Sequence, residues 1–162
     1  MPEVGDHAPD FTVPMAGGDA YDDIEPFTLS EALADGPAVL AFFPAAFTGG
    51  CTEELCTFRD ELSSFEALDA QVYGVSVDLP FALNVFGMEQ DLTFPLLSDF
   101  DGAAIEAYDV VLEGLHGMSG VAERSVFVVD TDGIVGYRWV REDGNPDFGW
   151  LVGEVREAVA AL

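Results

Sequence analysis

The sequence predicts a single α/β domain over residues 1–162, in which a central mixed β-sheet is flanked by helices. Three observations lead to this fold class. The chain of 162 residues has the usual length of one domain. Hydrophobic residues make up 49% of it, which is enough apolar surface to offset the entropy lost when a chain orders. From about residue 38 onward, strand-like and helix-like segments alternate.

The first clear strand and the first long helix are separated by Pro44. Residues 39–43 form a continuous apolar run that ends at this proline, which is typical of a buried strand. We expect a helix to begin after Thr48, whose side chain can serve as the N-cap. One apolar stripe follows at alternating spacings of four and three residues, formed by Cys51, Leu55, Phe58, Leu62 and Phe65. This stripe predicts that Cys51 points inward.

The later segments continue the alternation. We expect a strand over 71–77, a helix over 80–90 opened by proline, a shorter helix over 103–108, a hairpin of strands over 125–130 and 134–140, and an amphipathic helix over 149–162. The glycine-rich segment 113–120 is predicted to be a mobile loop.

The charge is the most unusual global property. The chain has 31 Asp and Glu residues against 5 Lys and Arg, a formal net charge of -26, and contains no lysine. Such a surface repels nucleic acid and anionic membranes, so neither is expected as a partner. Because the acids are scattered through every segment, we favour adaptation to high salt, as in a halophile, over an acidic patch for a basic partner.

The few cysteines and histidines, the lack of a long apolar stretch and the start of the chain argue against a membrane, secreted, disulfide-rich or metal-binding protein. No stretch approaches the roughly 20 apolar residues that span a bilayer, and residues 1–6 do not have the pattern of a signal peptide, so we expect a cytoplasmic protein. Cys51 and Cys56 are the only cysteines, too few for a disulfide scaffold. His7 and His116 show no ligand spacing with them, and neither a metal nor another cofactor is expected.

A cysteine in the first turn of a helix that follows a buried strand is a candidate reactive thiol. The unpaired N–H groups and the positive end of the helix dipole favour a thiolate there. A buried, inert cysteine on a core stripe fits the same pattern. The local pattern alone leaves both interpretations open.

Residues 44–51 read Pro-Ala-Ala-Phe-Thr-Gly-Gly-Cys, fit the signature Pro-x3-Thr-x2-Cys, and resemble the peroxiredoxin family. Residues 4–11, 94–99 and 124–130 resemble its start, its middle and the strand that carries its active-site arginine. The resemblance implies a thioredoxin-like fold. It extends to the bacterioferritin-comigratory and one-cysteine AhpE-like subgroups, although Gly49-Gly50 stands where the former usually has Pro-Gly.

Carried over residue by residue, the resemblance implies that Cys51 is the peroxidatic nucleophile and that Thr48 hydrogen-bonds the sulfur and the peroxide. It implies that Arg124 holds the thiolate and the bound oxygens, that Pro44 shields the pocket from water, and that the N–H groups of Gly50 and Cys51 complete the donor set.

Simpler structural roles are available for several of these residues. Thr48 can be only an N-cap, Pro44 only a strand terminator and Arg124 only an ion-pair partner, although Arg124 is one of just five cations. Arg59 is either near the site or paired with a neighbouring acid such as Asp60.

The predicted function is therefore a thiol-dependent peroxidase that reduces hydrogen peroxide and organic hydroperoxides through a sulfenic acid. Cys56 is the predicted resolving cysteine, a thioredoxin-like protein the predicted reductant, and a monomer or homodimer the expected state. In an intact helix the Cα atoms of Cys51 and Cys56 lie roughly 8.7 Å apart. This exceeds the roughly 7 Å limit for a disulfide, so the bridge requires the helix to unwind locally.

Three alternatives remain open from the sequence. Cys56 can be a bystander while an external thiol reduces the sulfenic acid directly. The chain can be a thioredoxin-type thiol–disulfide oxidoreductase, which the Cys-x4-Cys spacing disfavours, or an acidic interaction module that needs neither cysteine.

Overall fold

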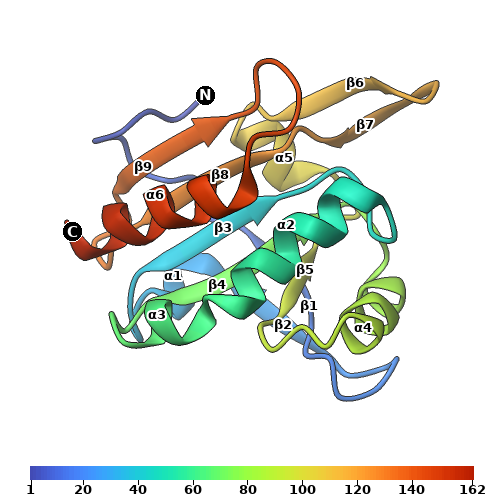
Figure 1. Ribbon diagram of the computed structural model, residues 1–162, viewed down its shortest axis with the longest axis horizontal. Coiled ribbons are helices and arrows are strands. Elements are labelled where there is room, and N and C mark those ends of the chain that lie inside the picture. Colours follow the sequence, from blue (N-terminus) through green and yellow to red (C-terminus); the bar gives the residue numbers. More distant parts are fainter.

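Seven strands form one mixed sheet in the order β2-β1-β5-β4-β3-β8-β9, and β6 pairs with β7 in a separate two-stranded ribbon (Figure 1). The structure is a computed structural model that describes residues 1–162. The strands are β1 (Thr12–Ala16), β2 (Ile24–Thr28), β3 (Ala38–Phe42), β4 (Gln71–Ser76), β5 (Leu96–Ser98), β6 (Val111–Leu115), β7 (Met118–Ala122), β8 (Ser125–Val129) and β9 (Val135–Val140). The helices are α1 (Leu29–Ala32), α2 (Gly49–Asp60), α3 (Leu62–Glu66), α4 (Pro80–Glu89), α5 (Ala103–Ala107) and α6 (Phe148–Ala160). The predicted α/β class with a central mixed sheet is confirmed.

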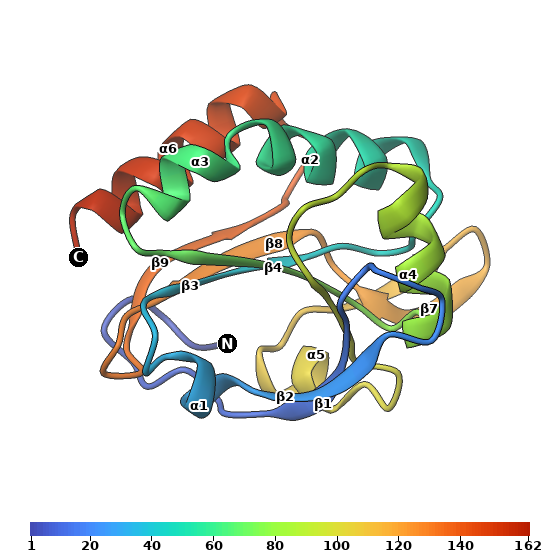
Figure 2. The same ribbon diagram turned by 90° about the horizontal axis from the view of Figure 1, so that it is seen from below.

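Helices cover both faces of the sheet, and each face has its own hydrophobic cluster. Figure 2 shows α2, α3 and α6 on one side and α1 and α5 on the other. The first cluster includes Phe43, Leu55 and Phe58 from the α2 side, and the second includes Leu29 and Ile105 from the α1 and α5 side. Strands β3 and β8 are buried along their whole length, as strands covered on both faces must be.

The register of the central strands brings distant parts of the chain together. Strand β3 is parallel to β4 and antiparallel to β8, and Phe42 at the end of β3 pairs with Ser125 at the start of β8. The residue before β8, Arg124, therefore lies beside the loop that leaves β3 and leads into α2.

Most predicted elements are confirmed within one or two residues, but the apolar stripe after Cys51 spans two helices. Helix α2 ends at Asp60, and Glu61 interrupts the helical backbone with φ -104° and ψ 7°. Leu62 is only half-buried, whereas Phe65 packs against Phe58 with ring centroids 5.9 Å apart. The change of direction keeps Phe65 in the core.

The prediction of a mobile loop over residues 113–120 is wrong. This segment belongs to the antiparallel ribbon of β6 and β7. Its glycines supply the backbone conformations that the ribbon needs, since His116 and Gly117 make the turn with φ 49° and 84°. The pairing of the two strands also shifts register on both sides of Glu113.

Residues 1–37, for which the sequence patterns predicted no strand or helix, contain β1, β2 and α1 and complete the sheet. β1 pairs antiparallel with both β2 and β5, and residues before β1 contact the far edge, where Gly5 donates to the carbonyl of Val135 over 2.8 Å. None of the helices has the length and apolar character required to cross a bilayer.

Candidate active site

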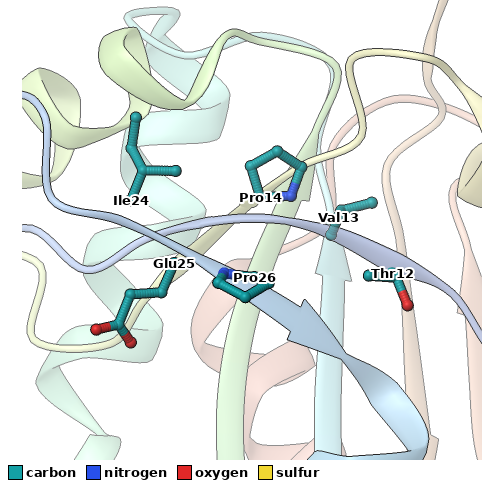
Figure 3. A pocket seen from close by; sticks show the side chains of 6 residues that line it. All are labelled: Thr12, Val13, Pro14, Ile24, Glu25 and Pro26. Atoms are coloured by element: carbon teal, nitrogen blue, oxygen red, sulfur yellow. The ribbon is translucent and has the colours of Figure 1, made fainter.

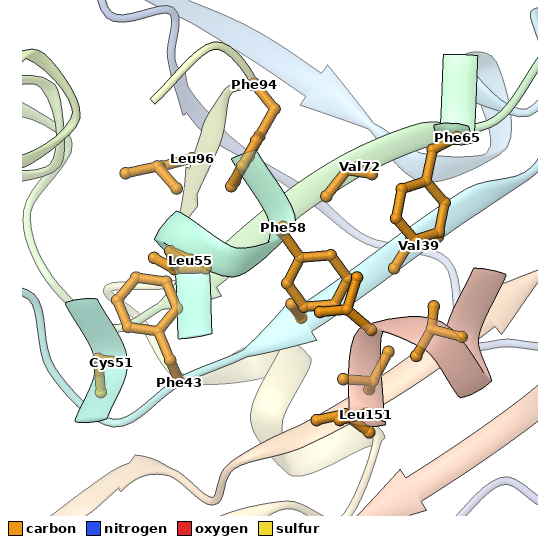
Figure 4. Close-up of a cluster of buried hydrophobic side chains, with 14 of the residues drawn as sticks. Val39, Phe43, Cys51, Leu55, Phe58, Phe65, Val72, Phe94, Leu96 and Leu151 are labelled. Atoms are coloured by element: carbon orange, nitrogen blue, oxygen red, sulfur yellow. The ribbon is translucent and has the colours of Figure 1, made fainter. Parts of the chain in front are cut away.

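Cys51 lies in the first turn of α2, directly after the loop that leaves β3. The helix begins at Gly49, with Thr48 at the N-cap position in an extended conformation. Cys51 is only 1% exposed and lies at one end of the cluster that contains Phe43 and Leu55 (Figure 4). The first N–H groups of a helix have no intrahelical acceptor, and the helix dipole is positive there. The sulfur is thus buried at an end of α2 that suits an anion.

The guanidinium of Arg124, the residue just before β8, contacts this sulfur. Its Nη2 donates to Cys51 Sγ over 3.3 Å, and the residue is only 3% exposed. Its Cζ lies 5.5 Å from the ring centroid of Phe148, within the range of a cation–π contact. The structure therefore joins two predicted site residues that are 73 positions apart in the sequence.

Glu54 is a third member of the site, and the sequence analysis did not identify it. It is fully buried, and its Oε2 lies 3.6 Å from Nη1 of Arg124, which is an ion-pair distance but too long for a hydrogen bond. Neither carboxylate oxygen has a hydrogen-bond partner. Burial raises the pKa of Glu54 from 4.5 to about 7, while the charge of Arg124 acts in the opposite direction.

Glu54 and Cys51 are two acids beside one buried arginine. When Glu54 is protonated, its carboxyl does not use the positive charge of Arg124, which is then left to the sulfur of Cys51. When Glu54 and Cys51 are both ionised, the two acids and Arg124 together carry one uncompensated negative charge in a buried site. The sequence contains a signal for Glu54: it stands three residues after Cys51, on the same helix face, where an acid among apolar residues is unusual.

Nε of Arg124, the third nitrogen of its guanidinium, is bound by Asn145, which sequence patterns did not single out. Nε donates to Asn145 Oδ1 over 3.0 Å, and the same oxygen accepts from Nη1 of Arg141, also over 3.0 Å. Asn145 lies in the loop between β9 and α6. No spacing rule links this loop to Cys51, so only the fold reveals the contact.

The other predicted residues of the motif lie in the loop between β3 and α2 or in the first turn of α2. Pro44 is buried two residues after the end of β3. Thr48 is exposed and occupies the N-cap position, but the prediction that its side chain caps α2 is wrong, because its Oγ1 donates to the carbonyl of Ala45 over 2.7 Å and accepts no N–H of the helix. A Cβ on Gly50 would lie 2.7 Å from Asn145 Nδ2 and would displace this amide.

Cys56 lies in the same continuous helix as Cys51 and is not bonded to it. Both are free thiols, and Cys56 is half-buried, with its Sγ 3.8 Å from Gln90 Oε1. Arg59 is not part of the constellation around Cys51. It pairs with Asp60 over 3.0 Å and donates to the carbonyl of Gln90 over 2.6 Å.

A shallow pocket elsewhere on the surface has different chemistry. It has a volume of about 350 Å³ and lies on β1 and β2, lined by Thr12, Val13, Pro14, Ile24, Glu25 and Pro26 (Figure 3). These strands are separated from β3 by β5 and β4. No cysteine or cation lines the pocket, so it has neither the thiol nor the guanidinium of the site around Cys51.

Comparison with known proteins identifies the family that this chain resembles along most of its length. Residues 4–138 match the AhpC/TSA family. The chain is 43% identical over 135 residues to a putative peroxiredoxin of Mycobacterium tuberculosis, covering 80% of this chain and 79% of that protein. It is 37% identical over 146 residues to alkyl hydroperoxide reductase E of the same organism, with 89% of each covered.

A solved structure has the same fold over the whole chain. The crystal structure of peroxidoxin BcpB from Mycobacterium tuberculosis superposes with a TM-score of 0.86 at 33% identity. The superposition covers 100% of this chain and 99% of the other.

Proposed function

This chain belongs to the AhpC/TSA family and is a peroxiredoxin of the bacterioferritin-comigratory and AhpE type, and we propose that Cys51 is the sulfur that attacks the peroxide. Its activity is that of a thiol-dependent peroxidase. The observation that carries the assignment of Cys51 is the 3.3 Å contact between its Sγ and Nη2 of the buried Arg124. Of the two cysteines, Cys51 alone has such a contact with an arginine.

The first half of the reaction transfers one oxygen to Cys51. The thiolate attacks the nearer peroxide oxygen, the O–O bond breaks, and the sulfur becomes a sulfenic acid. The electron pair of the O–O bond leaves with the second oxygen, which takes up a proton and departs as water or an alcohol. The sulfur is oxidised by two electrons and the peroxide is reduced by two.

The residues around the sulfur act on the charge that moves to the leaving oxygen. Donors fixed before the reaction stabilise developing charge at little reorganisation cost, and this is often the largest single contribution to catalysis. We assign that role to Arg124 and to the N–H groups of Gly50 and Cys51. The Thr48 hydroxyl, now on the carbonyl of Ala45, rotates to bind the peroxide, and Pro44 keeps bulk water from the sulfur.

In the second half of the reaction, we assign the resolution of the Cys51 sulfenic acid to Cys56. Its thiol attacks the sulfenic sulfur of Cys51, a disulfide forms and water leaves. Five residues of intact helix separate the two Cα atoms by roughly 8.7 Å, beyond the reach of a disulfide. The first turn of α2 must therefore unwind, and Gly49 and Gly50 lower the cost because glycine adopts many backbone conformations.

The peroxidase cycle is completed by a thiol reductant. We propose that a thioredoxin-like protein reduces the Cys51–Cys56 disulfide, that the enzyme works as a monomer or homodimer, and that it acts in the cytoplasm. The support for this location is the scarcity of cysteines, because a chain with only two of them has no disulfide scaffold that would need an oxidising compartment.

Two variants test the assignment of the sulfur. Peroxide consumption with a small dithiol as reductant should stop in Cys51→Ser and continue in Cys56→Ser, because the dithiol can reduce the sulfenic acid directly. Circular dichroism spectra that match the wild type establish that both variants are folded. Peroxide consumption by a folded, metal-free Cys51→Ser variant would exclude Cys51 as the attacking sulfur.

A further inference from the structure

One side-chain amide, that of Asn145, connects two arginines at the active site. Its Oδ1 accepts from Nε of Arg124 and from Nη1 of Arg141, each over 3.0 Å. Arg141 is itself held by Glu123, whose Oε1 lies 2.8 Å from Nε of Arg141 and 3.0 Å from the backbone nitrogen of Arg124. Asn145 is therefore anchored although it lies on a surface loop.

The nitrogen of the same amide packs against the start of α2. A Cβ on Gly50 would lie 2.7 Å from Asn145 Nδ2 and 3.2 Å from Arg124 Nη2, so the amide and the guanidinium fill the space that a side chain would occupy. A Cβ on the preceding Gly49 would meet nothing within 4 Å. Within the first turn of α2, the close packing is therefore specific to Gly50, the residue before Cys51.

The local structure of the loop between β9 and α6 does not explain why an asparagine stands at position 145. The helix that follows, α6, is capped by Asp147, whose Oδ1 accepts from the backbone nitrogen of Trp150 over 3.0 Å. All the hydrogen bonds of the Asn145 side chain go instead to Arg124 and Arg141.

The side chain of Asn145 is uncharged although it lies between two arginines. An aspartate would pair strongly with two guanidinium groups, and 31 of the chain's residues are acids. A carboxylate at this position would compete with Cys51 for the charge of Arg124. An amide of nearly the same shape accepts both hydrogen bonds and leaves that charge to the sulfur.

We propose that Asn145 is a positioning residue of the peroxidase: its oxygen fixes Arg124 against Cys51, and its nitrogen side keeps the first turn of α2 closed over the sulfur. The proposal rests on Cys51 being the attacking sulfur. It makes loop 141–147 a part of the active site, with Arg141 and Glu123 as its support.

The first test separates positioning from mere support of the fold. In a Cys56→Ser background, one turnover with hydrogen peroxide reports only the oxidation of Cys51. Asn145→Ala should slow this step by about tenfold, the usual effect of losing a hydrogen bond to a charged group. Asn145→Asp keeps the acceptor, so its melting temperature should equal or exceed that of its parent, yet its oxidation should also be slow.

The outcomes distinguish the assignment of Cys51 as the attacking sulfur from the positioning role of Asn145. If the parent itself does not oxidise Cys51, the assignment of the sulfur is wrong. If the parent oxidises Cys51 and both Asn145 variants react at its rate, the positioning role is wrong. A slow alanine variant beside an aspartate variant as fast as the parent would contradict the requirement for a neutral side chain, because it would show that the acceptor oxygen alone is sufficient.

The second test concerns the closed turn. Amide hydrogen exchange over residues 52–55, which begin with the hydrogen bond from Thr52 N–H to the carbonyl of Thr48, should be faster in Asn145→Ala than in the wild type, while exchange in β3 stays unchanged. Gly50→Ala, which displaces the amide, should slow Cys51 oxidation, and the matched Gly49→Ala should not. Unchanged exchange over residues 52–55, or equal rates in the two glycine variants, would contradict the packing role.

Discussion

Replacing Glu54 by glutamine changes the charge of the site while keeping its shape. Glu54 is fully buried, has no hydrogen bond to either carboxylate oxygen, and lies 3.6 Å from the guanidinium of Arg124. Burial raises its pKa to about 7, against an ordinary value of 4.5. The raised pKa makes the stability of the fold depend on pH through this one residue.

The sign of the effect follows from the order of the two pKa values. Below pH 4.5 the carboxyl is protonated in both the folded and the unfolded states and contributes no pH dependence. Between pH 4.5 and 7 the unfolded chain loses the proton while the folded chain keeps it, so stability falls as pH rises. At 1.36 kcal/mol per pKa unit, the wild type should lose about 2–3 kcal/mol through Glu54 between pH 5 and pH 8.

Urea unfolding at several pH values measures this loss. The free energy of unfolding of Glu54→Gln, minus that of the wild type, should rise by about 2–3 kcal/mol from pH 5 to pH 8. Glu53→Gln is the matched control, because Glu53 is the preceding residue of α2 and is exposed, so its difference should stay flat. A flat difference for Glu54→Gln would refute a raised pKa, and a falling one would show that Arg124 outweighs burial.

The remaining predictions concern catalysis, salt and resolution. Arg124→Met should slow Cys51 oxidation by about two to three orders of magnitude, the usual cost of removing a donor to a developing oxyanion. Arg156→Met, which removes an exposed cation, is the control, and equal stopped-flow rates for the two variants would contradict the role of Arg124. The melting temperature should rise steeply from dilute to molar potassium chloride, because salt screens the repulsion produced by a net charge of -26; a constant melting temperature would show that repulsion does not limit stability. After one equivalent of peroxide, mass spectrometry of the wild type should show a loss of two hydrogens and circular dichroism a loss of helix, whereas Cys56→Ser should accumulate sulfenic acid. If the wild type accumulates as much sulfenic acid as Cys56→Ser, the enzyme uses one cysteine only.

The parts of the fold with strong local patterns were predictable from the sequence. The apolar run before Pro44 is β3, and the stripe from Cys51 to Phe58 is the buried face of α2. The family resemblance supplied the pairing of Cys51 with Arg124, which the register of β3 and β8 produces in the structure. Periodicity and family motifs were sufficient for these features.

The parts that depend on tertiary contacts were not predictable in the same way. Glu54 occupies a buried position where local rules place an apolar residue, and only the nearby guanidinium explains its presence. Asn145 comes to the site from a loop without a recognisable pattern. The glycines of 113–120 indicate flexibility by composition, but cross-strand pairing of β6 and β7 uses them in a turn.

Trapping the first oxidised sulfur identifies the cysteine that attacks the peroxide. Reduced wild-type protein is mixed with less than one equivalent of hydrogen peroxide and quenched at early times with a reagent that labels sulfenic acids, and the labelled peptides are identified by mass spectrometry. We predict that the label appears first on Cys51 and that Cys56 carries none. A first label on Cys56, or peroxide consumed while Cys51 remains a free thiol, would contradict the account.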